Sequence, residues 1–163
     1  MPLNATGLAQ AGTAAALLRS RGIASLVASP LARSRVTAEI VAAALGLTVA
    51  LDDGLREAAF GVQEGQKMAG WFGDWVAGRF VPAGGESFAA LRARAVAAVN
   101  RALAGPAPVL VVAHGGMFRT LRAAMGVVSN QRTQNGVPIF CAPPQAGSGL
   151  AWTLTPLVAA PVE

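Results

Sequence analysis

The chain contains a single histidine, His114, and the residues around it favour a place in a binding site. It ends the continuously apolar run 109–113, which is typical of a parallel strand covered on both faces. Gly115 and Gly116 follow, before an amphipathic segment that predicts a helix. Open α/β sheets bind ligands at the carboxyl ends of their strands, and the N–H groups that begin a helix favour an anion. A lone histidine is more often structural, so this segment alone leaves both interpretations open.

An arginine with a similar placement occurs earlier in the chain. Ser29 and Pro30 follow a short apolar run and begin a predicted helix, and Arg33 falls in its first turn. Guanidinium binds phosphate bidentately, and the helix N–H groups would add to that attraction. Arg33 could therefore clamp a phosphate group, although a solvated helix arginine is the simpler alternative. Of the two neighbouring arginines, Arg35 is the better candidate for a surface residue.

Two glutamates could contribute acid–base chemistry. Glu57 is flanked by apolar residues in the segment 55–61, and partial desolvation there would suit a general acid. The alternative is an exposed loop carboxylate paired with Arg56. Glu86 precedes Ser87, which is a candidate helix cap, and its charge suits the positive end of the helix dipole. For Glu86 we favour that structural role over catalysis.

The remaining reactive or aromatic residues give weaker signals. Trp71, Phe72 and Trp75 recur at helical spacing, which favours packing, although they could also line a substrate pocket from a lid. Cys141 has no base near it in the sequence, so we take it as structural. One histidine and one cysteine cannot supply a usual zinc set, so we predict no metal and no other cofactor.

Composition narrows the class of protein. The 163 residues suit one domain spanning 1–163, with 53% hydrophobic and 13% charged residues and a mean hydropathy of +0.49. We expect no membrane span, because no apolar stretch approaches about 18 residues. The net charge is +5, yet the arginines are scattered, so we do not expect nucleic-acid binding. A single cysteine and the absence of a leader-like amino terminus predict a cytoplasmic protein.

Helices and strands alternate along most of the chain. Apolar periodicity, capping residues and turn residues predict an α/β fold, with a mostly parallel sheet and helices on both faces in three layers. Two late strands could add an antiparallel edge to that sheet. The predicted helices cover 6–19, 29–45, 66–77, 87–103 and the segment after 114, and the predicted strands cover 23–28, 47–51, 109–113, 137–141 and 150–155.

Taken together, the chemical segments resemble those of a known family. The motifs in order are Ser-Pro-Leu-x-Arg at 29–33, Leu-Arg-Glu at 55–57, Gly-Gly-Glu-Ser at 84–87 and His-Gly-Gly at 114–116. Their order and spacing are similar to those of the histidine phosphatase superfamily, in its phosphoglycerate mutase-like branch, over nearly the whole chain to about residue 120. The resemblance implies phosphomonoester hydrolysis without a metal. The expected bound ligand is a phosphorylated small molecule or inorganic phosphate.

The resemblance also implies residue roles. Arg33, His114 and Gly115 would bind the phosphoryl group, and Glu57 would donate a proton to the leaving oxygen. The family's nucleophile is a different histidine, in an Arg-His-Gly motif that ends an amino-terminal strand. The printed sequence has no such motif, and His114 matches the family's second, supporting histidine. The short stretch 62–84 favours a phosphatase over a mutase.

We therefore expect a phosphoglycerate mutase-like fold whose first inner strand is missing beside the strand 109–113. The exposed sheet would be covered by a homodimer contact or another chain. We expect the chain as given to be inactive because it lacks the nucleophile. Three explanations stay open: an amino-terminally truncated family member, a pseudo-enzyme that binds phosphorylated ligands without turnover, and an interaction domain.

Overall fold

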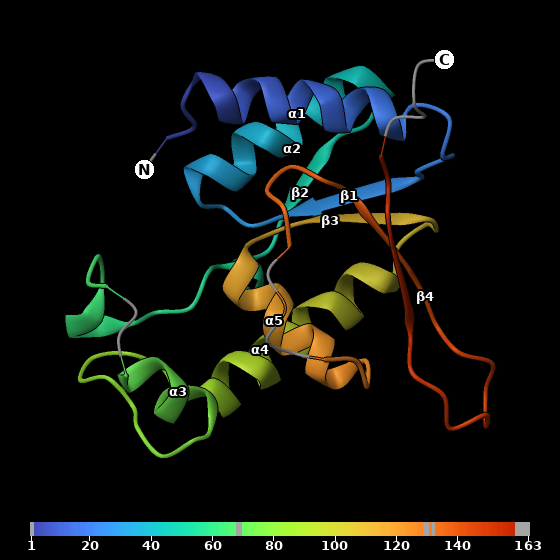
Figure 1. The fold of residues 1–163 in the computed structure, drawn as a ribbon. Coiled ribbons are helices and arrows are strands. Elements are labelled where there is room, and N and C mark those ends of the chain that lie inside the picture. The colour runs from blue at the N-terminus through green and yellow to red at the C-terminus, as the bar shows by residue number, and fades with distance from the viewer. Residues whose placement is uncertain (1, 68–69, 129–130, 132, 159–163) are drawn as a thin grey trace.

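A parallel sheet of three strands lies at the centre of the fold (Figure 1). The computed structural model describes residues 2–67, 70–128, 131 and 133–158. The strands β1 (Ser25–Ala28), β2 (Val49–Leu51) and β3 (Val109–Val112) have the order β2-β1-β3. Leu26 pairs with Val49 on one side and with Leu110 on the other. The carboxyl ends of all three strands therefore meet at one edge of the sheet.

Helices cover both faces of this sheet, as predicted. The pair α1 (Ala5–Leu18) and α2 (Ala32–Leu45) packs with Leu26 and Ala28 in one core cluster. The pair α4 (Phe88–Leu103) and α5 (Gly115–Ala124) packs with the intervening residue Val27 in a second cluster. Successive strand side chains point to opposite faces, so one short strand supplies both cores. The α/β class with helices on each side is confirmed.

Side-chain caps explain where two of these helices begin. Asn4 accepts the backbone N–H of Gly7 before α1, and Ser87 accepts that of Ala90 before α4. The predicted cap at Ser87 is thus confirmed. The apolar side chain of Leu8 on α1 is 47% exposed. Alanines form most of the buried stripe of α1 against α2, and this narrow stripe leaves Leu8 in solvent.

The chain between Glu57 and α4 is less helical than the sequence pattern predicts. The expected helix over 66–77 is limited to α3 (Trp71–Val76), and residues 68–69 of that prediction lie outside the described residues. Two short 3-10 turns, η1 (Asp53–Leu55) and η2 (Gly61–Gln63), precede it. Trp71, Phe72 and Trp75 pack with one another and with Phe60, which confirms a packing role for the aromatic residues.

The two late strands form a sheet of their own. β4 (Ile139–Ala142) and β5 (Thr153–Pro156) pair antiparallel, with Phe140 opposite Thr155. The prediction that they extend the parallel sheet is wrong, because neither hydrogen-bonds to it in the described part of the chain. The local patterns of the two strands reveal each strand but not its long-range partner.

β3 is more exposed than its apolar sequence predicts. All four of its residues are half-buried, whereas two of the four residues of β1 are buried. β3 is one of the two outer strands of the sheet, and no described strand pairs with its other edge. Both faces of β3 are nevertheless covered, as expected: Leu110 and Val112 pack against the α1 and α2 cluster, and Val111 packs against the α4 and α5 cluster. None of the described helices is both long and apolar enough to cross a membrane.

Candidate functional site

His114 and Ser29 meet at the carboxyl edge of the parallel sheet. His114 follows β3 and is the N-cap residue of α5, while Ser29 follows the neighbouring strand β1. A hydrogen bond of 2.8 Å joins His114 Nε2 to Ser29 Oγ, and Ser29 Oγ also accepts the backbone N–H of Leu31 at 3.3 Å. Ser29 is fully buried and His114 is 8% exposed. The imidazole is therefore fixed by its contact with the adjacent strand end.

Burial and nearby cations keep this imidazole neutral. The pKa of His114 is lowered from 6.5 to about 4, first because burial disfavours the charged ring and next because Arg33 is positively charged. Arg56 and Arg94 lower the pKa further, and the Glu57 carboxylate acts in the opposite direction. At neutral pH the ring can accept or donate one hydrogen bond through each nitrogen.

Arg33 lies in the first turn of α2, close enough for its charge to act on His114. A hydrogen bond of 2.7 Å from Ser34 Oγ to the Val112 carbonyl ties this turn to the end of β3. The Arg33 guanidinium has no ion pair among the described residues, whereas Arg35 lies 3.4 Å from Glu39 on the exposed side of the helix. The predicted surface position of Arg35 is confirmed.

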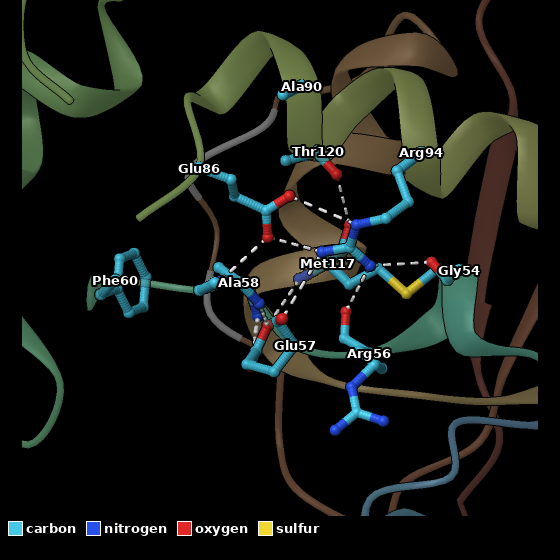
Figure 2. Close-up of polar contacts among 12 residues, drawn as sticks. Gly54, Arg56, Glu57, Ala58, Phe60, Glu86, Ala90, Arg94, Met117 and Thr120 are labelled. Atoms are coloured by element: carbon cyan, nitrogen blue, oxygen red, sulfur yellow. Dashed lines mark hydrogen bonds and ion pairs between the residues drawn. The ribbon is translucent and has the colours of Figure 1, made fainter. Parts of the chain in front are cut away.

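The carboxylate of Glu57 closes the N-terminus of α5 (Figure 2). Its oxygens accept the backbone N–H groups of Gly116 at 3.2 Å and Met117 at 3.0 Å, and that of Ala58 at 3.0 Å. A Cβ atom at Gly116 would lie 2.5 Å from Glu57 Oε1, so any larger residue there would displace this carboxylate. The predicted attraction of this helix start for an anion holds, but the chain's own glutamate supplies the anion.

The alternative pairing of Glu57 with Arg56 is wrong. Arg56 instead lies 3.0 Å from Asp53, one turn back along the chain. Of the first N–H groups of α5, that of Gly115 has no partner among the described residues. It is the remaining helix-start donor for a ligand.

Arg94 holds the Glu57 loop from α4, and the sequence analysis did not find this role. Its Nη1 donates to the carbonyl oxygens of Gly54 and Arg56, both at 2.9 Å. Its Nη2 lies 2.6 Å from Glu86 Oε1 and 3.5 Å from the Glu57 carbonyl oxygen. Figure 2 shows the guanidinium between the Glu86 carboxylate and the loop backbone. Three of its partners are backbone carbonyls, which no residue pattern reveals.

Glu86 therefore does more than complement a helix dipole. Besides the ion pair with Arg94, its Oε1 accepts the backbone N–H of Ala59 at 2.9 Å. The backbone N–H of Glu86 donates in turn to the Ala59 carbonyl at 2.9 Å, and Trp75 Nε1 donates to the Glu86 carbonyl at 2.8 Å. Glu86 thus joins the start of α4 to the loop that carries Glu57.

A second arginine of α4 holds the same loop further upstream. Arg101 lies two helical turns after Arg94, and its guanidinium donates to both oxygens of Asp52, at 2.8 and 3.0 Å. Asp52 also accepts the backbone N–H of Gly54 at 2.7 Å. The hydrogen bond from Arg101 lowers the pKa of Asp52. Two cations on one helix face therefore hold the segment that ends at Glu57.

One edge of the sheet brings together the Arg33 guanidinium, the neutral His114 imidazole and the backbone N–H of Gly115. Such donors suit the oxygen atoms of an anion, and phosphate in particular can accept a bidentate guanidinium. No group of three or more histidine, cysteine, aspartate or glutamate side chains in the described part could hold a metal ion. Cys141 is half-buried, and burial raises the pKa of its thiol.

The fold and the edge at which these residues lie place the chain among α/β proteins with a ligand site at the carboxyl ends of parallel strands. The family described as histidine phosphatase superfamily (branch 1) matches residues 1–137. The chain belongs to this superfamily.

Several relatives are similar over most of this chain. The bifunctional protein Rv2228c of Mycobacterium tuberculosis is 40% identical over 126 residues, which cover 69% of this chain and 34% of that protein. The chain thus spans about a third of that relative's length. A probable phosphoglycerate mutase, GpmB of Yersinia enterocolitica, is 38% identical over 127 residues, covering 70% of this chain and 58% of that protein.

Solved structures agree with the fold over nearly the whole chain. The native mycobacterial glucosyl-3-phosphoglycerate phosphatase Rv2419c superimposes with a TM-score of 0.77 at 26% identity, covering 98% of this chain and 89% of the other. The complex of that phosphatase with inorganic phosphate gives a TM-score of 0.72 at 28% identity, covering 94% and 85%. The relatives with named activities in this set are thus phosphatases and mutases.

Proposed function

We propose that this chain binds inorganic phosphate or a phosphorylated small molecule at the edge where β1 and β3 end. Arg33 would donate hydrogen bonds to the phosphoryl oxygens, and His114 and the backbone N–H of Gly115 would complete the site. The observation that carries the proposal is the proximity of the unpaired Arg33 guanidinium to a buried, neutral His114. The structures of a relative in complex with inorganic phosphate and with VO3 support the same ligand class.

The reaction class that the family supports is phosphomonoester hydrolysis through a phosphohistidine. In a member that carries the nucleophile, the residue matching Glu57 would protonate the leaving oxygen, and those matching Arg33 and His114 would stabilise the charge on the transferred group. The printed sequence supplies one imidazole, and its Nε2 is already bonded to Ser29. We therefore propose that the chain as given binds the phosphoryl group without turning it over. Loss of the nucleophile removes several orders of magnitude in rate.

The binding proposal can be tested on the only imidazole of the chain. Inorganic phosphate is titrated while the His114 ring is followed by NMR between acid and neutral pH. A bound anion stabilises the charged ring, so the pKa of His114 should rise from about 4 as phosphate saturates. Phosphate should also raise the melting temperature. Arg33→Ala should remove both effects, and Arg35→Ala, on the same helix, should leave them. Unchanged His114 signals at millimolar phosphate would refute the site.

An activity assay tests the proposal that this chain binds the phosphoryl group without turning it over. Hydrolysis of p-nitrophenyl phosphate by the 163-residue chain should be negligible. Robust turnover that His114→Ala abolishes would overturn the view of His114 as a supporting residue. Such a result would make it the nucleophile.

A second candidate function rests on the exposed β3. Its four apolar residues are half-buried, and its outer edge has no partner among the described strands. Unpaired edges recruit other strands, so we propose a homodimer that covers this edge. Light scattering should then give twice the 16.4 kDa mass of one chain. A monomer at high protein concentration would contradict it.

A further inference from the structure

Arg119 of α5 carries a positive charge that no described acid neutralises. Its side chain is half-buried, and none of the ion pairs between described residues includes it. Arg94 and Arg101, by contrast, are each paired with a carboxylate. Withdrawing a charge from water is unfavourable, so other groups around Arg119 must offset this cost.

Phe72 of α3 is the group that holds this guanidinium. The Cζ atom of Arg119 lies 5.6 Å from the centroid of the Phe72 ring, which is within the range of a cation–π contact. Phe72 packs on Trp75, and Trp75 packs on Ala58, the residue after Glu57. The aromatic ring attracts the cation but carries no net charge. The guanidinium is therefore fixed on the side of the Glu57 loop while its charge stays available to a ligand.

The side chain of Arg119 leans towards the proposed phosphate site. Helical side chains tilt towards the N-terminus, and residues four apart share one face, so Arg119 extends towards Gly115. Gly115 is exposed, and a Cβ atom there would meet no other group within 4 Å. The space between the Arg119 side chain and the backbone N–H of Gly115 is therefore open.

Arg119 lies beyond the groups that surround the imidazole of His114. Four charged side chains shift the pKa of His114, and Arg119 is not one of them. Four helical residues span about 6 Å along the axis. An anion bound at the Gly115 N–H would therefore have the Arg119 guanidinium about one helical turn away.

We propose that Arg119 selects ligands by binding a second acidic group, one helical turn from the phosphoryl group. This inference rests on the proposed phosphate site, in which Arg33, His114 and the Gly115 N–H hold the phosphoryl oxygens. The second acidic group accepts a bidentate pair of hydrogen bonds from the guanidinium. A ligand with an uncharged end leaves Arg119 without a counter-charge. Arg119 is thus a specificity-determining residue, distinct from those that bind the phosphoryl group.

Two phosphonates of equal chain length test this role, because their P–C bond is not hydrolysed. 4-Phosphonobutyrate ends in a carboxylate and butylphosphonate in a methyl group. Titrations followed on the His114 ring by NMR should show that the parent chain binds 4-phosphonobutyrate about tenfold more tightly, the usual gain from a charged hydrogen-bonded pair. Arg119→Gln should abolish this preference and leave the affinity for butylphosphonate unchanged. Arg92→Gln, which removes an exposed charge from α4, should keep the preference.

Three results would overturn the role of Arg119. They are equal affinities of the parent chain for the two phosphonates, an unchanged preference in Arg119→Gln, and an equal loss of both ligands in that variant, which would mean that Arg119 only holds α3. Inorganic phosphate separates this inference from the proposed function. If phosphate shifts the His114 signals but the parent shows no preference, only the role of Arg119 fails. If neither phosphate nor a phosphonate shifts them, both proposals fail.

Discussion

The Glu57 carboxylate accepts the backbone N–H of Met117 at 3.0 Å, across 60 residues of sequence. One loop side chain thereby closes the helix that follows His114. The same carboxylate acts on the His114 ring, whose pKa it raises against the larger effect of burial. Glu57 thus couples the start of α5 to the protonation of the imidazole.

Neutralising Glu57 should change both properties. In Glu57→Gln the pKa of His114 should fall further below its ordinary value, because the carboxylate that favours the charged ring is gone. The free energy of unfolding should fall by about 1 kcal/mol, the usual loss for a weakened helix cap. NMR titration of the single imidazole and urea unfolding measure the two effects. Glu39→Gln, in the exposed pair with Arg35, is the control. An unchanged His114 pKa would show that the charge of Glu57 does not reach the ring.

Arg94 should be the most sensitive arginine of α4. Arg94→Met removes the cation paired with Glu86 and the donor to three loop carbonyls, which should cost about 2 kcal/mol or more in unfolding free energy. Arg94→Lys should recover only part of this, since one ammonium cannot replace the planar fork. Arg92→Met, on the exposed side of the same helix, should stay within about 0.5 kcal/mol of the parent. Equal losses of unfolding free energy in Arg94→Met and Arg92→Met would contradict the role of Arg94 in holding the Glu57 loop.

Stability should depend on pH through His114. Its pKa is about 4 in the folded chain and 6.5 in the reference state, so between these values the unfolded chain binds a proton that the folded chain excludes. The unfolding free energy should therefore rise with pH over this window. The contribution is fully present above about pH 6.5 and is lost as the pH falls to about 4. It amounts to at most about 3 kcal/mol.

Urea unfolding at a series of pH values measures this effect. His114→Asn should lack this rise, so the difference in unfolding free energy between parent and variant should change with pH between about 4 and 6.5 and stay constant outside that window. The comparison cancels the carboxylates that titrate in both proteins. Parallel curves from pH 4 to 7 would contradict the lowered pKa of His114.

Replacing each of two glycines with alanine should change the stability of the chain in opposite directions. Gly61 has φ +52°, and a Cβ atom there would collide with the Ala83 carbonyl and the Gly85 backbone. Gly61→Ala should cost about 1–3 kcal/mol from the backbone conformation, with the collision in addition. Gly12→Ala should stabilise the chain by up to about 1 kcal/mol, because this helical position has open space around it. Thermal unfolding measures the stability of both variants. A change in the same direction for both would contradict the prediction.

Local patterns predicted the elements better than their long-range partners. The apolar run before His114 and the cap at Ser87 each depend on neighbouring residues, so the sequence located β3 and the start of α4. The separate pairing of β4 with β5 depends on register across a turn, which apolar alternation does not encode. The half-burial of β3 depends on which strands flank it, a property of the whole sheet.

The candidate site shows the same division. His114 and Arg33 stood out because each follows a strand and begins a helix, and the structure brings both to one sheet edge. The hydrogen-bond partners of Glu57 could not be predicted, because they are backbone N–H groups, which every residue except proline has. The same holds for Arg94, whose loop contacts are carbonyl oxygens.

The stretch from Phe60 to Gly85 begins and ends at one place, and Trp75 anchors its middle against Phe88 and Leu91 of α4. Ala59 and Glu86 exchange hydrogen bonds at its base, and the N–H of Val62 donates to the Ala83 carbonyl just beyond. Arg94 and Arg101 hold the Glu57 loop from α4, and Trp75 is the residue of the stretch that packs against this loop, at Ala58. Lengthening such a closed excursion costs little, about 0.6 kcal/mol per doubling. New sequence can therefore be inserted in the exposed part of the stretch, around Val62, while buried Trp75 keeps the stretch on α4 and Glu57 keeps its place beside His114.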